Sequence, residues 1–374
     1  MEKIKAGIIG CGLRGRHFIR GPLSREPRIK VIAVQDIKPE NVTEALKWAP
    51  KGVKKFSDYR DVLKLSDLDL AIIMTPDHTH EEMVVAAFKA GKHVFCEKPL
   101  ALTPAGCKRC IQAGKKAGKK LVIGFVLRYA AMYVKTKALL DSGAIGKVVG
   151  AWVLHSVASG SQWYFHDWHA VKANTNGLLL QKGSHDFDII NWMVGGKPVR
   201  VAAFARRQAF GGDKPNDLTC PVCDIKETCP EANFEPASLT QCAFRKEIDV
   251  DDNHVVIIDY DNGAMVSYNE CHSTPEDNRH YIWIGSEGKL EMNEREGHIR
   301  VRRRHTRKYD EYVGPWAEGG HGGGDEGLTQ DLVKCVLEGG EPVAGADSGY
   351  WSIVVAEGAE RAIASGKVED LSKY

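Results

Sequence analysis

Two short patterns combine residues that can hold a dinucleotide with a residue that can move a proton. The first is Gly10-Cys11-Gly12-Leu13-Arg14-Gly15, and the second is Glu97-Lys98-Pro99. Glycines at these spacings permit a tight turn, close approach of a pyrophosphate and packing of a helix on a strand. A lysine at the carboxyl end of a later strand lies where doubly wound folds bind ligands. Together the patterns predict redox chemistry on an alcohol.

Asp36 decides which dinucleotide we expect. It follows the apolar run from Ile29 to Val34, and it lies about 20 residues after the glycines, at the end of a second predicted strand. A carboxylate there accepts hydrogen bonds from both ribose hydroxyls of NAD and repels the 2′-phosphate of NADP. Lys38 partly offsets that repulsion. We therefore expect NAD rather than NADP.

A second candidate segment for chemistry runs from Gly177 to Asp188, and it reads as an apolar strand that leads into a helix. Gln181, His185 and Asp188 recur at helical spacings, so they are expected on one face. A lone histidine is often structural. A histidine beside a lysine and a nicotinamide can instead exchange a proton with a substrate hydroxyl. Lys98 and His185 are therefore the candidate catalytic residues.

Strands alternate with helices in the first third of the chain. This alternation predicts an α/β domain with a doubly wound parallel sheet over residues 1–125, which binds NAD. The predicted strands are Ile4–Ile9, Ile29–Val34, Leu68–Met74, His93–Cys96 and Leu121–Gly124.

Residues 126–374 follow a different pattern, which predicts an α+β domain for substrate binding and oligomerisation. Hairpin turns are expected at Asp261-Asn262-Gly263 and Ser286-Glu287-Gly288, so the sheet should be large, open and mostly antiparallel. The predicted strands are Lys147–Val157, Val199–Phe210, His254–Tyr260, Ala264–Glu270, Tyr281–Gly285 and Lys289–Asn293, and the predicted helices are Tyr133–Ser142, Gly183–Met193, Leu328–Glu338 and Ser348–Ser365.

Charge and hydropathy argue against nucleic acid or a membrane as the main partner. The chain has 374 residues with 51 basic and 49 acidic side chains. No apolar stretch is long enough to span a bilayer, and no apolar signal region is evident, so a cytoplasmic protein is expected. The basic run from Arg300 to Lys308 fits a solvated strand face better than a phosphate-binding patch.

Four of the ten cysteines lie in one polar, proline-containing stretch, at Cys220, Cys223, Cys229 and Cys242. A Cys-x-x-Cys turn is typical of tetrahedral zinc, and a structural ion would stabilise a loop with little core. A disulfide or redox pair and free thiols are the alternatives. The other cysteines lie within apolar patterns, which suits a reducing compartment.

The chain resembles the Gfo/Idh/MocA family of glucose-fructose oxidoreductase, inositol dehydrogenase and rhizopine catabolism proteins over nearly its whole length. The motifs that carry the resemblance are GCGLRG at 10–15, TPDHTH at 75–80, GKHVFCEKP at 91–99, the glycine, histidine and aspartate pattern at 177–188, and HGGGD at 321–325. The resemblance implies a Rossmann domain followed by an open-faced sheet, with the nicotinamide between them. It also implies a secondary alcohol of a sugar, glycoside or cyclitol as substrate, and dimers or tetramers packed through the sheet.

The motifs, the residue chemistry and the resemblance together give three groups of candidate residues. Lys98 and His185 match the catalytic lysine and histidine of the family. The cofactor-binding candidates are Gly10, Gly12, Leu13, Arg14, Gly15, Asp36, Thr75, Pro76, His78, His80, Glu97, Lys98 and Trp168. The substrate-binding candidates are Arg128, Tyr129, His166, His169, Gln181, Lys182 and His321. The aromatic segment from Trp163 to His169 fits either stacking on a sugar or covering the nicotinamide.

One departure from the family keeps two further functions open. Many family dehydrogenases have an aspartate four residues before the histidine, where this chain has Gln181 followed by Lys182. Glutamine accepts no proton at neutral pH, so more of the proton transfer falls on Lys98 or His185. One alternative is an NAD-dependent glycosidase, in which transient oxidation, elimination, water addition and re-reduction give no net redox change. The other is a non-catalytic protein that binds NAD and a sugar.

Overall fold

The computed structural model of the protein describes residues 3–314, 316 and 321–374. The chain forms two compact units, each built from two separate stretches of sequence. Residues 1–134 and 316–353 form the first unit, and residues 135–315 and 354–374 form the second. Within the described ranges, no helix combines the length and the apolar character needed to cross a membrane.

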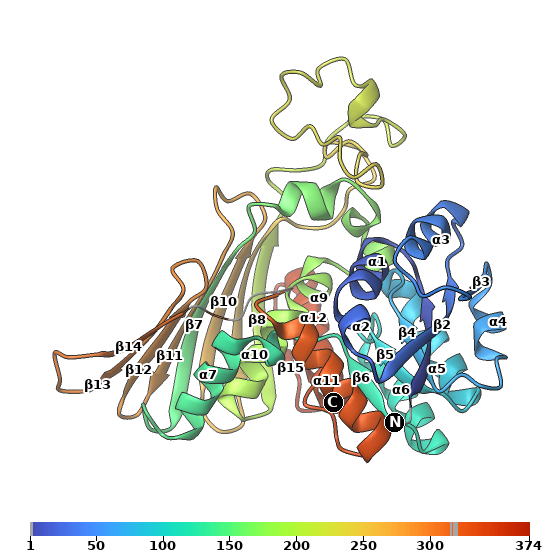
Figure 1. Ribbon diagram of the computed structural model, residues 1–374. Coiled ribbons are helices and arrows are strands. Elements are labelled where there is room, and N and C mark those ends of the chain that lie inside the picture. The colour runs from blue at the N-terminus through green and yellow to red at the C-terminus, as the bar shows by residue number, and fades with distance from the viewer. Residues whose placement is uncertain (1–2, 315, 317–320) are drawn as a thin grey trace. The chain divides into compact units, whose positions relative to one another are not determined.

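The first unit contains a six-stranded sheet in the order β3-β2-β1-β4-β5-β6 (Figure 1). All its pairs are parallel, which confirms the predicted doubly wound sheet. The carboxyl ends of these strands therefore meet at one edge, where such folds bind ligands. The strands are β1 (Ile4–Ile9), β2 (Ile29–Gln35), β3 (Lys54–Phe56), β4 (Leu70–Ile73), β5 (His93–Cys96) and β6 (Leu121–Ile123).

The helices of the first unit begin and end at recognisable signals. Pro39 and Pro104 open two of them, and the Thr103 hydroxyl accepts a hydrogen bond from the Gly106 amide at 3.1 Å. Gly118 ends the second of these helices in the left-handed conformation. The elements are α1 (Leu13–Arg20), α2 (Pro22–Arg25), α3 (Pro39–Leu46), α4 (Tyr59–Leu63), η1 (Asp77–Thr79), α5 (His80–Lys89), α6 (Pro104–Ala117), η2 (Val126–Tyr129) and α11 (Gly324–Glu338).

The core of the first unit joins residues that are distant in sequence. Ile8 on β1 and Phe18 on α1 share one buried cluster with Leu328 and Leu332 on α11. The rings of Phe18 and Phe95 stack at 5.4 Å. Helix α11 is therefore part of this unit, although more than half of the chain separates it from α6.

The second unit is built on a nine-stranded sheet in the order β14-β13-β12-β11-β7-β10-β9-β8-β15. Among the described strands of this sheet, only the pairing of β7 with β10 is parallel, so the predicted open, mostly antiparallel sheet is confirmed. Both predicted hairpins are present, and Gly263 adopts φ +85 in the first. The strands are β7 (Val148–Ser156), β8 (Pro198–Arg206), β9 (Asn253–Tyr260), β10 (Met265–Cys271), β11 (Asn278–Gly285), β12 (Gly288–Asn293), β13 (His298–Arg303), β14 (Asp310–Val313) and β15 (Glu369–Asp370).

One predicted strand of the second unit is instead helical. Residues Leu178, Leu179 and Leu180 belong to the short helix α9, which begins after Gly177 in a conformation with φ +94. All three leucines are fully buried, and a short buried apolar run does not distinguish strand from helix. The other helices are η3 (Ser161–Phe165), η4 (Trp168–Ala170), α8 (Lys172–Thr175), α9 (Leu178–Gln181), α10 (Ser184–Val194) and η5 (Cys220–Val222). Helices α7 (Ala131–Asp141) and α12 (Ala346–Ser365) begin in the first unit and end in the second.

The two faces of the large sheet differ in an unusual way. Along β7, Val153 and His155 are buried, whereas Trp152 and Leu154 are exposed. Helices α7 and α10 lie on one side of the sheet, and among the described residues of this unit no helix covers the other side (Figure 1). The polar His155 is thus on the covered face, and the large apolar Trp152 and Leu154 lie on the open face.

The first part of the basic run, Arg300 to Arg303, lies on strand β13 as predicted, whereas Arg304 to Lys308 lie in the connection to β14. Arg300 lies on β13, and its Nε donates to Glu311 on β14 at 2.6 Å. Arg302 donates from Nε to the carbonyl oxygen of Thr306. These contacts match a solvated sheet edge rather than a patch of unpaired cations.

Candidate functional site

Three glycines shape the turn between β1 and α1. Gly10 has φ +93, and a Cβ there would lie 2.4 Å from the carbonyl oxygen of Met74. A Cβ on Gly15 would lie 2.1 Å from the carbonyl oxygen of Gly10, so only glycine lets α1 start this close to β1. At Gly12, by contrast, a Cβ would meet no atom within 4 Å. A tight turn that is open above a helix N-terminus fits the pyrophosphate of a dinucleotide.

Asp36 follows β2 and is bound to this turn. One carboxylate oxygen accepts a hydrogen bond from the Cys11 amide at 2.8 Å, and the other accepts one from the Lys38 amide at 2.8 Å. Because an ionised carboxylate has about four lone-pair sites, acceptor capacity remains for two ribose hydroxyls. The residues at this edge of the sheet therefore fit an NAD cofactor, which would supply the hydride acceptor when bound.

Lys98 directly follows β5, at the same edge of the sheet. The residue is half-buried, its amide donates to Glu97 at 3.2 Å, and the Lys98–Pro99 peptide bond is cis. The buried ring of His80 forms hydrogen bonds with the carbonyl oxygens of Pro99 and Thr75, at 2.7 and 2.8 Å. His80 thus ties the end of β4 to the residue after Lys98, which makes it a positioning residue.

Arg14 and Glu97 were both predicted to contact the cofactor, and in the structure their side chains bind each other. The Arg14 guanidinium donates to Glu97 and to Asp325 on α11, each at 2.6 Å. His321 lies 2.9 Å from the same buried aspartate. Burial alone would raise the pKa of Asp325, but the hydrogen bonds from His321 and Arg14 hold it well below its usual range. This network fastens α1, β5 and α11 together around the lysine motif.

Some of the remaining candidate residues of the first unit have accessible side chains, and others form hydrogen bonds within the protein. Thr75 and Pro76 are half-buried at the end of β4, and His78 is exposed on η1. The Tyr129 hydroxyl donates to Asp331 at 2.7 Å and accepts from the Ala344 amide. Arg128 donates to the Val343 carbonyl oxygen. The contacts of Arg128 and Tyr129 therefore give them a structural role within this unit. Leu13 is the first residue of α1, and its side chain is exposed.

In the second unit, α9 and α10 carry the segment around His185. Gln181 and Asp188 are buried, and His185 and Lys182 are half-buried. The backbone between the two helices keeps a helical turn, because the His185 amide donates to the Lys182 carbonyl oxygen at 3.3 Å. Lys182 and His185 are therefore separated by one helical turn.

The aromatic segment before this helix pair combines one structural histidine with a more accessible stacked pair. His166 is fully buried, and its ring forms hydrogen bonds with the Gln241 carbonyl oxygen and the Ser161 hydroxyl. Burial lowers the pKa of His166. Trp168 and His169 stack with ring centres 3.8 Å apart, and both are half-buried. The contacts of His166 are those of a structural residue, whereas Trp168 and His169 keep accessible surface.

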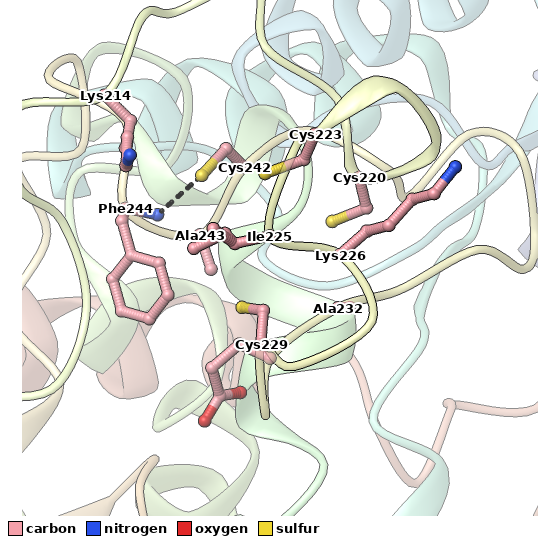
Figure 2. Close-up of a pocket in the computed structure, with 11 residues that line it drawn as sticks. Lys214, Cys220, Cys223, Ile225, Lys226, Cys229, Ala232, Cys242, Ala243 and Phe244 are labelled. Atoms are coloured by element: carbon pink, nitrogen blue, oxygen red, sulfur yellow. Dashed lines mark hydrogen bonds between the residues drawn. The ribbon is translucent and has the colours of Figure 1, made fainter.

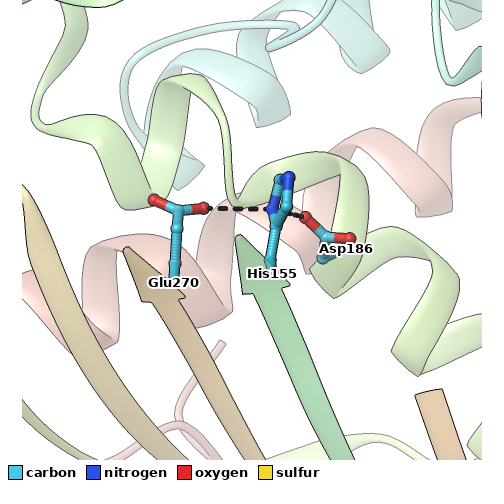
Figure 3. Close-up of side chains that lie close together, drawn as sticks. All are labelled: His155, Asp186 and Glu270. Carbon is cyan, nitrogen blue, oxygen red and sulfur yellow. Dashed lines mark ion pairs between the residues drawn. The ribbon is translucent and has the colours of Figure 1, made fainter. Parts of the chain in front are cut away.

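The structure contains a buried polar cluster between α10 and the large sheet that was not predicted from the sequence. His155 on β7 is the register partner of Glu270 on β10, and it lies 2.8 Å from Asp186 on α10 (Figure 3). Tyr268 donates to both carboxylates, at 3.1 and 2.6 Å. A period-two pattern with polar residues in the buried phase of β7 and β10 is the signal that would have revealed it.

The two carboxylates of this cluster are held as anions. Asp186 also accepts from Arg279 at 2.9 Å and from the Tyr281 hydroxyl, and Glu270 pairs with His272 at 3.0 Å. Burial alone would raise the pKa of Asp186, but His155 and Arg279 hold it far below the usual range. The pKa of Glu270 is likewise low, because hydrogen bonds from His155 and His272 outweigh its burial.

The four cysteines that were candidates for metal binding line one pocket (Figure 2). The pocket holds a cavity of about 20 Å³, and Lys214 and Lys226 also border it. All ten cysteines are free thiols, so the disulfide alternative is not formed. The described residues bring no three of these sulfur atoms within 4.8 Å of one another, so the structure does not show a closed zinc site.

Comparison with known proteins gives matches over both units. Residues 4–125 match the model of the oxidoreductase family with an NAD-binding Rossmann fold, and residues 137–370 match that of the family's C-terminal alpha/beta domain. The protein YteT of Bacillus subtilis is 28% identical, over 96% of each chain. An inositol 2-dehydrogenase of Salmonella typhimurium is 31% identical, over 66% of this chain and 70% of the relative.

Solved structures share the fold at lower identity. A levoglucosan dehydrogenase in complex with NADH and levoglucosan superposes with a TM-score of 0.82 at 20% identity, over 99% of this chain and all of the other. An aldose-aldose oxidoreductase from Caulobacter crescentus gives 0.75 at 22% identity, with the same coverage. With the two family models covering both units, the chain belongs to the Gfo/Idh/MocA family of oxidoreductases.

Proposed function

We propose that this protein is an NAD-dependent oxidoreductase that acts on a secondary alcohol of a sugar or cyclitol. The observation that carries the proposal is a convergence at one sheet edge. The glycine turn follows β1, Asp36 follows β2 and Lys98 follows β5, and these strands belong to one parallel sheet. Inositol 2-dehydrogenases and a levoglucosan dehydrogenase among the similar proteins support a polyhydroxylated substrate.

Within this proposal, Lys98 and His185 handle the proton of the substrate hydroxyl. Oxidation removes a hydride from carbon and a proton from oxygen, and the side chains of the protein must accommodate the proton. Residues 1–125 bind NAD, and residues 126–374 supply substrate contacts, for which Trp168 and His169 are the accessible candidates. Asp36 favours NAD over NADP, because its carboxylate would repel a 2′-phosphate.

A substrate panel tests the proposed function. The purified protein is incubated with NAD and with cyclitols, free sugars and aryl glycosides, while NADH absorbance and aglycone release are both followed. NADH formation in proportion to the keto product supports the oxidoreductase. Aglycone release without NADH would instead identify the redox-neutral glycosidase. Binding of NAD and a sugar with neither signal would leave a non-catalytic protein.

We also propose that the open face of the large sheet is where copies of this chain associate, as a dimer or tetramer. Phe204 on β8 is 69% exposed and Trp152 on β7 is 57% exposed, and Leu154, Ile257 and Met265 add to the same exposed apolar set. Apolar patches of this kind mark protein interaction sites.

The ten free thiols suit a reducing compartment, so we propose that the protein is cytoplasmic.

For the cysteine pocket we propose a structural zinc ion. Its segment, between β8 and β9, contains only the short η5 and two isolated bridges as regular structure. The Phe244 amide donates to the Cys242 sulfur at 3.4 Å, as is expected for a sulfur prepared to bind metal (Figure 2). Lys214 and Lys226 would offset the negative charge of four thiolates. Closure around an ion would bring the sulfurs together and stabilise the loop.

Metal analysis of protein purified without chelators tests the zinc proposal. About one zinc per chain is expected, and Cys223→Ser combined with Cys242→Ser should remove it. Cys271→Ser, outside the pocket, is the matched control. A zinc content below about 0.2 per chain in the native protein would overturn the proposal.

A further inference from the structure

Among the residues that the structure describes, the ammonium group of Lys182 has no counter-ion. Its Nζ lies 5.2 Å from the centre of the Tyr164 ring, and no described residue forms a hydrogen bond or an ion pair with it. Lys182 is half-buried, and a charge that is partly removed from water is costly unless it is paired, so this lysine favours either a bound ligand or its neutral form. Burial is the main reason that the pKa of Lys182 falls to about 8.

The surroundings of Lys182 come from several elements. Asp186 on α10, Glu270 on β10, and Arg279 with the nearby Asp277 are the charged groups that act on it, and the His272 ring is also close enough to interact. Tyr164 on η3 covers it and packs edge-on against His272, with ring centres 5.2 Å apart. The two buried carboxylates already have other donors: Asp186 accepts from His155, Arg279 and two tyrosines, and Glu270 accepts from Tyr268 and pairs with His272. They attract the ammonium without pairing with it.

The turn that carries Lys182 is pressed against this cluster. A Cβ on Gly183 would lie 2.7 Å from the Leu179 carbonyl oxygen and 3.3 Å from a carboxylate oxygen of Glu270. Only glycine fits there without displacement of its neighbours. The position of Lys182, one helical turn before His185, is therefore set by packing on both sides.

We propose that Lys182 accepts the proton that leaves the substrate hydroxyl by way of His185. The proposal rests on the function proposed above and concerns the same site. In the oxidation, the C–H bond breaks and its electron pair leaves as hydride to the nicotinamide. The O–H bond breaks as the carbonyl forms, with Lys98 and His185 handling the proton as proposed above; His185 then passes the proton on, and an N–H bond forms on Lys182. The resulting ammonium then loses its proton to water.

The local charges favour a proton acceptor over a site for an anionic sugar. Two cations, Lys182 and Arg279, face three carboxylates, Asp186, Glu270 and Asp277. This environment has no excess of positive charge with which to bind a carboxylate or phosphate. An amine whose pKa is lowered to about 8 is, however, better suited to general base catalysis than an ordinary lysine.

The pH dependence of kcat/KM for NADH formation tests the proposal. The native enzyme should gain rate as pH rises through about 8. Lys182→Met and Lys182→Arg should both lose this limb and about 10²-fold or more in rate, since neither side chain accepts a proton in this range. Added ethylamine should restore part of the activity of Lys182→Ala. Lys367→Met, at an exposed lysine of the same unit, should behave as the native enzyme.

Three outcomes would overturn the proposal. Native kinetics in Lys182→Arg would show that only a cation over Tyr164 is required. A loss confined to anionic sugars, with an unchanged pH profile, would show anion recognition instead. No rescue of Lys182→Ala by amines, at native melting temperature, would remove the proton-accepting role. If the native enzyme forms no NADH with any sugar, the underlying oxidoreductase proposal fails, which is a separate result.

Discussion

The imidazole Nδ1 of His80 lies 2.7 Å from the carbonyl oxygen of Pro99, the residue that follows the candidate catalytic lysine. The other ring nitrogen is bonded to the Thr75 carbonyl oxygen. One buried side chain therefore links the ends of two neighbouring strands, β4 and β5. The position of Lys98 depends on this link, although His80 itself is enclosed by protein.

Replacement of His80 by Phe should destabilise the first unit and slow the reaction. The carbonyl oxygens of Pro99 and Thr75 would lose their contacts with the ring, and a buried polar group left without a hydrogen bond costs about 1–3 kcal/mol. Urea denaturation should show this loss, and kcat should fall more than the affinity for NAD. Thr43→Val, which removes a hydroxyl contact on exposed α3, is the control. Unchanged stability and kcat in His80→Phe would contradict the positioning role.

Replacement of Lys98 by Met should abolish most of the oxidation while NAD still binds. Loss of a proton-handling group typically costs about 10²–10⁴-fold in rate. Steady-state NADH formation measures kcat, and fluorescence titration measures NAD binding. Lys89→Met, at the exposed end of α5, should leave both unchanged. Substantial activity in Lys98→Met would disprove the assignment.

Replacement of Asp36 by Ser should change the preference between dinucleotides. The variant loses a charged acceptor for the ribose and also the repulsion of a 2′-phosphate, so KM for NAD should rise about 10- to 100-fold while NADP becomes usable. Asp36→Asn keeps an oxygen acceptor for the Cys11 amide, so it separates the charge effect from disruption of the turn. Equal loss with both cofactors would mean that the turn, rather than recognition, was damaged.

Glu360 should make the protein less stable as pH rises from about 4.5 to about 7. Burial raises its pKa from 4.5 to about 7, and Lys172 only partly opposes this. The folded state therefore binds the proton more tightly than the unfolded state, and that advantage disappears once both states are ionised. Glu360→Gln lacks this dependence, so the native protein should lose up to about 3 kcal/mol relative to the variant across this range.

Denaturation of both proteins at several pH values provides the measurement for Glu360. Asp186 and Glu270 are present in both proteins, so their contributions cancel in the difference. Their lowered pKa values act in the opposite direction, because the stability they provide is complete above their ordinary pKa and disappears only in strong acid. A difference between the proteins that does not vary with pH would show that Glu360 titrates normally.

Replacement of Trp152 by Glu should dissociate the oligomer without unfolding the chain. A charge at the centre of an apolar interface costs far more than one in water. Sedimentation analysis should give a smaller species than for the native protein, with unchanged circular dichroism. Trp48→Glu is the matched control, because Trp48 is exposed on the other unit. Identical masses for native protein and Trp152→Glu would remove this face as the interface.

Much of the fold follows from local patterns in the sequence. The glycine turn and the two hairpins of the large sheet are present where they were predicted. The three-residue strand β3 was not predicted, because its Lys54-Lys55-Phe56 sequence has no apolar run. The leucines of α9 were misread because tertiary packing, rather than periodicity, decides the conformation of a short buried segment.

The site was harder to predict, because residue type does not reveal hydrogen-bond partners. His80 and His166 have the chemistry of functional residues, but their rings are bonded to carbonyl oxygens that are distant in sequence. The cluster of His155, Asp186 and Glu270 depends on the register of two parallel strands and on the packing of α10. Neither can be read from spacing alone.

The return of residues 316–353 to the first unit has a consequence for biosynthesis. Arg14 meets Asp325 only after almost the whole chain has left the ribosome, and Leu328 and Leu332 complete the core around Ile8 just as late. The nucleotide-binding unit begins first but is finished nearly last. An exchange of this unit between relatives must therefore transplant two segments, since residues 1–125 alone would leave a charged pair and an apolar surface uncovered.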